Sequence, residues 1–597
     1  MRLSDVLNVG EICEVSGRKV KAGVYVNKNA EYLNYEGNII KSVGIGTFVI
    51  IKKGFTNIVG KVDGEYMKDL KIEDYSFSKE VKRFVSIDIL GIIKKDIFIA
   101  GLTELPTIGN NVYIATDTIK KTILNCNNKH SIKLGKLIQD FDYPFEIDAQ
   151  KLMCSHIGIF GNTGSGKSNT LAKIYNEIIE KYKNNLSFRE NSHFCVFDFN
   201  GEYKNVFDNA KYYNFSTKEK YEDNSNKYHL NIDDIQSVDF WSLIFNATEK
   251  TQKPFIKRCI SLYKKVINND YCIDTKKISE IITNLNANYN DCKYYIKTIF
   301  ELLNITESYD VLEDILFANG NSNNLYILDD NGNSKYQVNT SMIENKIFGE
   351  YRIFDLSNLN SFSKFELTLL INYCMEIGKA YISKEHIGPM MSRSQNKIKE
   401  ISSIFSISAN NKVESGIEVF YLGDLSIEYR KMVPMIICKK LYDEKKKNSK
   451  NRVKKSLHII VDEAHNILST ESVRESEEWK DYRLEVFEEI VKEGRKFSTF
   501  LTISSQRPSD ISDTIISQLH NYFIHRLVND EDLRKIRKSV SFIDGETNDM
   551  IPILPSGGCI FSGIASNYPI LAQINILPKE KQPLSETIDI DKCWVDE

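Results

Sequence analysis

The segment GNTGSGKS, Gly161–Ser168, limits the possible folds of this 597-residue chain more than any other feature. It fits the pattern G-x-x-x-x-G-K-[ST] and lies between the apolar run HIGIF at 156–160 and a stretch with apolar residues at helical spacing. A strand that turns through glycines into a helix presents backbone N–H groups to a bound phosphate. We therefore predict a phosphate-binding loop in an α/β fold with a mostly parallel sheet.

The residue types in this segment suit nucleotide binding. Glycines permit the turns and the close approach of the backbone to phosphates. Lys167 can neutralise the β- and γ-phosphates, and Ser168 can bind Mg²⁺. An accidental glycine-rich turn is the alternative, but the flanking strand and helix argue against it. The predicted nucleotide-binding residues here are Gly161, Asn162, Thr163, Gly164, Ser165, Gly166, Lys167, Ser168 and Asn169.

The segment LHIIVDEAHN at 457–466 supplies a second half to this site. Its apolar run predicts a buried strand that places Asp462 at the carboxyl end, where open α/β sheets bind ligands. Asp462 would hold Mg²⁺ through water, and Glu463 would polarise the water that attacks the γ-phosphate. The alternative is that this acidic pair caps the helix that follows.

Three further polar groups follow or precede predicted strands. Asp198 and Glu202 of VFDFNGEY could face the nucleotide, although an Asx-type turn explains Asp198 nearly as well. Gln506 ends the apolar strand TFLTIS, where it can contact the γ-phosphate or the attacking water. Arg495 precedes that strand, on the far side from its own nucleotide, which suits an arginine offered to a neighbouring subunit. A solvated charge at a helix end is the alternative for Arg495.

The chain as a whole predicts several domains. Residues 1–145 carry short β-rich runs with glycine turns, typical of a small β-barrel or sandwich. Strands and helices alternate over 146–245 and 346–578, whereas 246–345 is a helical insertion and 579–597 a tail. The polar stretch 392–416 is predicted to be a surface loop, and the basic run 439–455 a solvated surface, with nucleic-acid contact the weaker alternative.

Composition restricts partners and location. Lys and Arg total 78 and Asp and Glu 81, so any contact with nucleic acid must be local. The 11 cysteines are scattered, without a C-x-x-C pair or Cys/His zinc spacing, which predicts reduced thiols in the cytoplasm. The N-terminus carries Asp5, and no apolar run approaches the roughly 20 residues that span a membrane.

Together these motifs resemble the HerA family of bacterial and archaeal ATPases, in the FtsK/HerA branch of RecA-like P-loop motors. The matching segments occur in family order from about residue 135 to residue 578. They are GNTGSGKSNT, DFNGEY, TQKPFIKR, FDLSNLN or YLGDLS, HIIVDEAH, EGRK, SSQRPSDIS with IISQLHNYFIHRL, and ILPSGGCIFSG with SNYP. The family's DLS strand could lie near Ser357 or Ser426, and we favour 423–426 because a helical pattern follows it.

The resemblance implies an N-terminal β-barrel, a RecA-like core with a helical insertion, and a hexameric ring that binds ATP and Mg²⁺. It makes Lys167 and Ser168 the Walker A pair, and Asp462 and Glu463 the Walker B pair. It also implies that the arginine of EGRK, at position 495, acts in trans and that the glutamine of SSQRP, at position 506, is a sensor.

Family members act on double-stranded DNA with a partner nuclease, or stand beside nucleases or sirtuin-type NAD hydrolases in antiviral defence. This chain shows neither a nuclease motif nor a NAD-hydrolysing one, so the resemblance implies a separate effector protein. Two functions stay open. One is a motor that moves along duplex DNA, and the other is a hexameric scaffold whose nucleotide state activates an effector.

Overall fold

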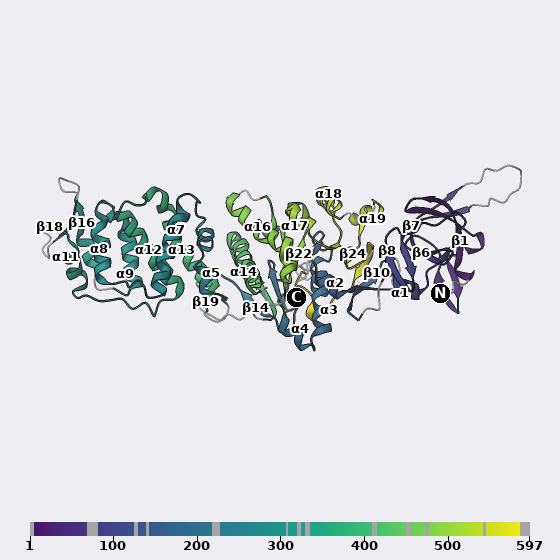
Figure 1. Ribbon diagram of the computed structural model, residues 1–597, viewed down its shortest axis with the longest axis horizontal. Helices are drawn as coiled ribbons and strands as arrows, with labels where there is room; N and C mark the ends of the chain where they lie inside the picture. Colours follow the sequence, from purple (N-terminus) through teal and green to yellow (C-terminus); the bar gives the residue numbers. More distant parts are fainter. Residues whose placement is uncertain are drawn as a thin grey trace, which may run out of the picture.

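The computed structural model describes most of the chain. Figure 1 shows an elongated molecule in which an N-terminal β-barrel, a central α/β domain and a helical domain follow one another along the long axis. None of the described helices combines the length and apolar character that crossing a membrane requires. The described residues are 5–68, 82–124, 129–138, 143–217, 227–305, 309–318, 324–328, 335–408, 415–448, 455–471, 477–540, 545–566 and 568–585.

The N-terminal domain is a closed barrel, as the sequence predicts. Six strands pair in the order β2-β1-β9-β5-β6-β7, and β7 pairs with β2 to close the barrel. Their apolar side chains, such as Ile50 and Ile87, are fully buried because alternate residues of each strand point inward. The strands are β1 (Asn8–Ser16), β2 (Lys19–Val24), β5 (Phe48–Lys53), β6 (Thr56–Lys68), β7 (Lys82–Lys94) and β9 (Asn111–Ile114), with β8 (Ile97–Ala100) added beside β7.

The barrel ends before the predicted boundary at residue 145. The strands β10 (Ser131–Leu137) and β11 (Pro144–Asp148) belong to the central sheet. β10 pairs antiparallel with β25 (Ile570–Ile574), more than 400 residues later in the chain. Pairing at such a separation leaves no local pattern, so the predicted boundary at residue 145 puts β10 in the wrong domain and divides β11.

The central domain is an 11-stranded sheet with the order β11-β10-β25-β24-β23-β12-β22-β21-β13-β20-β14. From β23 to β14 all neighbours are parallel, and the four strands at the other edge are antiparallel. The predicted mostly parallel sheet is therefore confirmed. The remaining strands are β12 (Ile157–Phe160), β13 (Ser192–Asp198), β14 (Lys211–Asn214), β20 (Gly416–Tyr421), β21 (Ser456–Val461), β22 (Thr499–Ser505), β23 (Asn521–Ile524) and β24 (Gly558–Gly563).

Two hydrophobic cores cover the two faces of this sheet. Along β13, Cys195 and Phe197 belong to one core, whereas Phe194 and Val196 belong to the other. Both faces are buried, which explains why the strand reads as a continuous apolar run. The helix α3 (Lys167–Tyr182) packs in one core, and the helices α14 (Ile427–Asn448) and α16 (Glu477–Glu493) pack in the other.

The helical domain extends further than the predicted insertion at 246–345. Its last long helices are α12 (Ser361–Gly378) and α13 (Lys384–Ile404). The surface loop predicted at 392–416 is therefore wrong over most of its described length. Met391, Ile398 and Ile401 are buried at helical spacing, so a sparse apolar stripe suffices for this helix. The earlier helices are α6 (Val238–Phe245), α7 (Gln252–Ile267), α8 (Thr275–Leu285), α9 (Tyr289–Leu302), α10 (Tyr309–Asp314) and α11 (Thr340–Ile343).

The segment after α13 returns to the sheet at the favoured DLS position. β20 lies between β13 and β14, and it leads through 423–426 into α14. The other DLS, around Ser357, precedes α12 in the helical domain. The basic run at 439–455 is not simply solvated, because the lysines Lys440 and Lys445 are buried and donate to the carbonyls of His229 and Lys455.

Candidate nucleotide site

The phosphate-binding loop connects β12 to α3, as predicted. Gly164 and Gly166 have φ of 72° and 106°, a conformation that side chains rarely tolerate. A Cβ on Gly161 would lie 2.6 Å from the Cβ of His525, so this glycine is required by close packing. The sequence G-x-x-x-x-G-K-S is therefore needed for the shape of the loop as well as for its chemistry.

The side chain of Lys167 is buried within the loop. Its Nζ donates to the carbonyl of Asn162 at 3.2 Å. Burial lowers its pKa, and the nearby carboxylates of Glu463 and Asp462 oppose that shift. Within the described part of the chain this buried ammonium bonds to its own loop, so it is placed to turn toward an incoming phosphate.

The buried histidine His525, which the sequence motifs do not predict as a site residue, packs against the phosphate-binding loop. His525 follows β23, and its Nδ1 lies 2.8 Å from the carbonyl of Gly558 and its Nε2 2.9 Å from Thr170 Oγ1. Since a carbonyl only accepts, Nδ1 carries the proton and Nε2 accepts from Thr170. Burial lowers the pKa of His525 to about 4, so it is neutral. The histidine lies within the segment IISQLHNYFIHRL, but its role depends on packing that no local pattern reveals.

The C-terminal segment also holds the loop. Ser556 Oγ donates to the carbonyl of Gly164 at 3.0 Å, and the Gly557 N–H donates to the carbonyl of Ser165 at 2.9 Å. Asn169, which we predicted to contact nucleotide, uses both ends of its amide on the backbone of 575–577. The structure therefore assigns Asn169 to the attachment of this segment.

Asp462 follows β21 and is almost fully buried. Burial raises its pKa to about 7, and repulsion from the carboxylates of Glu202 and Glu463 adds to the increase. The partly exposed carboxylates of Glu202 and Glu463 thus lie near the buried Asp462 and Lys167. Such a cluster favours a divalent cation over three unshielded negative charges.

Gln506 joins the two halves of the site. Its Oε1 accepts a hydrogen bond from Thr163 Oγ1 at 2.5 Å, and its Nε2 donates to Glu463 Oε1 at 3.4 Å. Glu463 itself has a φ of 45°, unusual for a residue with a side chain and common where backbone strain serves a site. The predicted sensor therefore lies between the phosphate-binding loop and the second carboxylate of the DE pair.

Asp198 does not face the nucleotide as predicted. Its carboxylate accepts four backbone N–H groups at 2.8–3.2 Å, those of residues 200–203. It is fully buried and closes a turn in which Gly201 has a φ of 80°. The Asx-type turn, the alternative reading of the sequence, is the correct one because both carboxylate oxygens are used by the backbone.

That turn places two other side chains at the site. Glu202 is close enough to raise the pKa of Asp462, and its Oε2 is buried without a hydrogen-bond partner in the described part of the chain. Tyr203 is fully buried beside Ser168 and Asp462, whose charge contributes to its raised pKa after burial itself. Glu202 was predicted for this site, whereas Tyr203 was not, because an aromatic in a buried run is usually core.

The residues of the nucleotide site fit Mg²⁺, the ion that the phosphate-binding motif implies. Mg²⁺ takes oxygen ligands and retains waters, and it binds through one or two protein groups plus phosphates. The hydroxyl of Ser168 and the carboxylate of Asp462 are the oxygens that would hold it, with the buried, unpartnered Oε2 of Glu202 nearby.

We expect Asp462→Asn to stabilise the protein in the absence of nucleotide and Mg²⁺. The pKa of Asp462 is raised above its unfolded value, so the wild type loses stability as pH rises through about 7. The gain from the amide should reach at most about 4 kcal/mol near pH 8 and shrink on acidification, when the wild type protonates Asp462. Thermal unfolding at pH 5 to 8 measures this, and a gap that grows toward pH 5 would contradict it.

Arg495 lies at the opposite edge of the sheet from the nucleotide site. It precedes the first residue of β22. The other end of this seven-residue strand lies next to Gln506 and the phosphate-binding loop. At about 3.3 Å per residue the two ends of the strand are about 20 Å apart, beyond the reach of a side chain. Arg495 is exposed, and its Nη1 lies 3.0 Å from His520 Nε2. The structure thus keeps this arginine away from its own site.

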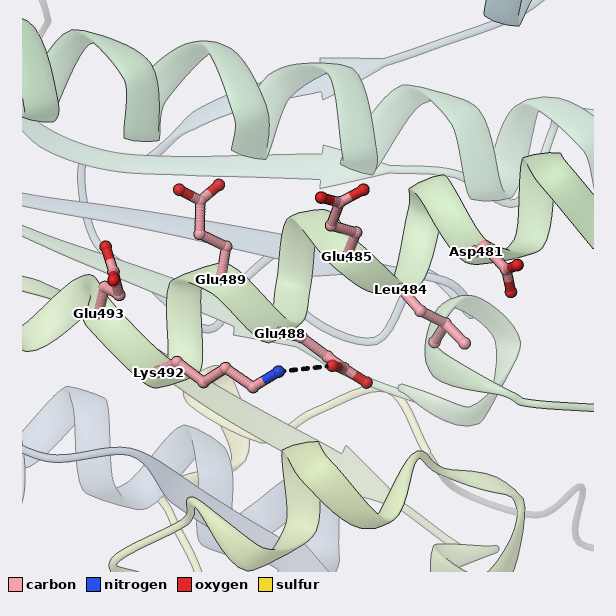
Figure 2. Close-up of a pocket in the computed structure, with 7 residues that line it drawn as sticks. All are labelled: Asp481, Leu484, Glu485, Glu488, Glu489, Lys492 and Glu493. Atoms are coloured by element: carbon pink, nitrogen blue, oxygen red, sulfur yellow. Dashed lines mark hydrogen bonds and ion pairs between the residues drawn. The ribbon is translucent and has the colours of Figure 1, made fainter. Parts of the chain in front are cut away.

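The helix before Arg495 carries a strongly acidic face. Figure 2 shows the hollow on α16, lined by Asp481, Leu484, Glu485, Glu488, Glu489, Lys492 and Glu493. Its one lysine pairs with Glu488 at 2.9 Å. Glu489 pairs with Lys446 of α14, so five carboxylates stand against two paired lysines, and the net negative charge of this face disfavours binding to DNA.

Several known proteins are similar to this chain. A family model described as "Helicase HerA, central domain" matches residues 132–350. A probable helicase of Methanocaldococcus jannaschii is 23% identical over 546 residues, which cover 89% of this chain and 86% of the relative. The DNA double-strand break repair helicase HerA of Sulfolobus acidocaldarius is 22% identical over 580 residues, covering 95% and 91%. The solved structure of VirB4 of Thermoanaerobacter pseudethanolicus aligns with a TM-score of 0.39 and 13% identity, over 76% of this chain and 98% of that one.

Proposed function

The chain belongs to the HerA family of P-loop ATPases, and from that premise we propose that it forms a hexameric ring that hydrolyses ATP to move along double-stranded DNA. One observation supports this most strongly. The hydrogen-bonded bridge through Gln506 joins both halves of the nucleotide site within one chain, while Arg495 lies at the far edge of the sheet. The guanidinium of Arg495 in one copy could therefore reach the nucleotide site of a neighbouring copy in a ring.

Each residue has a place in the proposed reaction. The loop N–H groups and Lys167 orient the phosphates in line with the attacking water. Glu463 accepts the proton of that water, and burial favours this because it raises the pKa of its carboxyl. Mg²⁺ held by Ser168 and Asp462 would neutralise charge on the β- and γ-phosphates. Gln506 would pass a change at the γ-phosphate to Glu463 and Thr163.

Arg495 of one copy would complete the site of the next. A cation that reaches the transferred phosphoryl group stabilises the charge that develops in the transition state. Hydrolysis would then depend on ring assembly, and the sites would hydrolyse ATP in an order set by contacts between subunits. This dependence is what a ring needs in order to convert hydrolysis into movement.

We further propose that the ring works in the cytoplasm with a separate effector, a nuclease or a sirtuin-type NAD hydrolase, in DNA processing or antiphage defence. The barrel is the proposed docking domain. It stands at one end of the molecule, and the large apolar side chains of Ile39, Phe55 and Ile97 are exposed on it. Exposed apolar side chains of this size favour contact with another protein.

Steady-state ATP hydrolysis with and without linear duplex DNA tests the proposal. We expect duplex to stimulate the rate several-fold, because a translocating ring couples turnover to contact with its track. The Glu463→Gln variant serves as the blank. A rate that ignores duplex would instead support the nucleotide-switched scaffold, in which ATP assembles and activates the effector.

A further inference from the structure

A second cluster of chemically reactive side chains lies inside the central sheet, away from the nucleotide site. His193 and Cys195 lie two residues apart on β13 and so point to the same face. Glu418 on β20 is the direct cross-strand partner of Cys195. All three side chains are buried, with exposed fractions of 4%, 0% and 5%. Cys195 is three residues before Asp198, so the cluster is separated from the nucleotide edge by about 10 Å of strand.

The donor atoms of this cluster converge on one point. His193 Nε2 lies 2.7 Å from Glu418 Oε2 and 3.3 Å from Cys195 Sγ, and the three atoms all lie within 4.8 Å of one another. In a tetrahedral zinc site, neighbouring nitrogen, oxygen and sulfur ligands are about 3.3–3.6 Å apart. To surround a metal ion, the His193 to Glu418 pair would open slightly, and any pair wider than this range, up to 4.8 Å, would close slightly.

The other carboxylate oxygen is also held. Tyr213 on β14 donates its hydroxyl to Glu418 Oε1 at 3.1 Å. Metal-ligating carboxylates are commonly oriented in this way by an outer hydrogen bond. Three adjacent strands thus contribute to one buried site, with β20 in the middle.

We propose that His193, Cys195 and Glu418 bind a zinc ion that ties β13 to β20. Imidazole, thiolate and carboxylate are the three donor types that zinc accepts from proteins, and a water molecule can complete the tetrahedron. One thiolate and one carboxylate cancel the charge of Zn²⁺, so the ion and its ligands together carry no net charge, which lowers the cost of burying them. Mg²⁺ and Ca²⁺ prefer oxygen ligands, so sulfur and nitrogen donors select against them.

A metal-free explanation makes a different prediction. In that case Glu418 is only the acceptor for His193 and Tyr213, and Cys195 is an inert core thiol. The two explanations differ in metal content and in the chemistry of the thiol. They can be separated without any measurement of ATP turnover.

The test is the metal content of the full chain, produced in zinc-containing medium and purified without chelators or metal resins. We expect about one zinc ion per chain by plasma mass spectrometry. Replacement of the zinc by Co²⁺ should produce the near-ultraviolet charge-transfer band of a cobalt thiolate. Zinc at background level together with no cobalt thiolate band would overturn the proposal.

Variants assign the metal to these residues. Cys195→Val should remove the cobalt band, and Glu418→Gln should lower the zinc content while keeping the shape of the site. Cys559→Val is the matched control, since Cys559 is equally buried but lies on β24. Glu463→Gln should retain zinc, which excludes the nucleotide site as its location. A band that persists in Cys195→Val, or is lost in Cys559→Val, would contradict the assignment.

Discussion

Replacing Arg495 by alanine is expected to lower the rate of ATP hydrolysis by about 10³-fold or more, while the affinity for ATP stays within a few-fold of the wild type. The arginine lies about 20 Å from its own site along β22, so it cannot hold a nucleotide there. Its proposed contact is made only in the transition state of a neighbouring copy. Such a residue affects turnover and leaves ground-state binding nearly unchanged.

The comparison variant is Lys496→Ala, which removes an exposed charge from the adjacent position. It should hydrolyse ATP at the wild-type rate. Loss of the Arg495 contact with His520 is a local effect, which equal melting temperatures of variant and wild type would demonstrate. Wild-type turnover in Arg495→Ala would remove the arginine from the mechanism.

Replacing Glu463 by glutamine is expected to lower turnover by about 10²–10⁴-fold, with ATP binding retained. The amide keeps the shape of the side chain but cannot accept the proton of the attacking water. Removing one of three clustered carboxylates also relieves repulsion, so nucleotide binding should not weaken. Single-turnover hydrolysis and equilibrium binding of a labelled nucleotide measure the two effects separately.

Glu485→Gln on the acidic face of α16 is the matched control for this change. It removes a carboxylate of the same type from an exposed position. The control should behave as the wild type in both measurements. A Glu463→Gln protein that still turns over at the wild-type rate would show that another group activates the water.

The two inactive variants can also be combined. If differently tagged Glu463→Gln and Arg495→Ala chains are co-purified as mixed rings, some interfaces pair an intact Glu463 with an intact Arg495 of the neighbour. Random mixing gives such an interface about a quarter of the time, so up to about a quarter of the wild-type rate should return. Mixed rings as inactive as either parent would place Arg495 in cis or outside the reaction.

The parts of this site that depend on adjacent residues could be predicted from the sequence. The loop from Gly161 to Ser168 and the pair Asp462 and Glu463 follow buried apolar strands, so their positions at one edge of a parallel sheet follow from periodicity alone. Gln506 was predictable for the same reason. The position of Arg495, away from its own nucleotide site, was predictable because it precedes a strand whose direction the motif order sets.

The parts of the site that depend on residues far apart in the chain could not be predicted from the sequence. His525 supports the loop through Gly558 and Thr170, which are 33 and 355 residues away in the chain. Asp198 had two readings with the same local sequence, and only the four backbone donors around its carboxylate decide between them. The pairing of His193 with Glu418 likewise spans 225 residues.

The fold shows the same division. Strands in the core and helices α7 and α8 have strong patterns and lie where the sequence predicts them. The helix α13 has a weak stripe, with polar residues on most of its surface, so its residues from 392 onward were predicted to be a loop. The predicted boundary at residue 145 puts β10 in the barrel domain, because its partner β25 is near the other end of the chain.

Displacement of a third strand from linear duplex DNA tests the central claim most directly. A triplex-forming oligonucleotide bound near one end of the duplex is released only when a protein moves along the duplex into it. We predict release that requires ATP and is absent with Glu463→Gln. Vigorous ATP hydrolysis by the wild type without any release of the third strand would contradict translocation, and with it the proposed function of this ring.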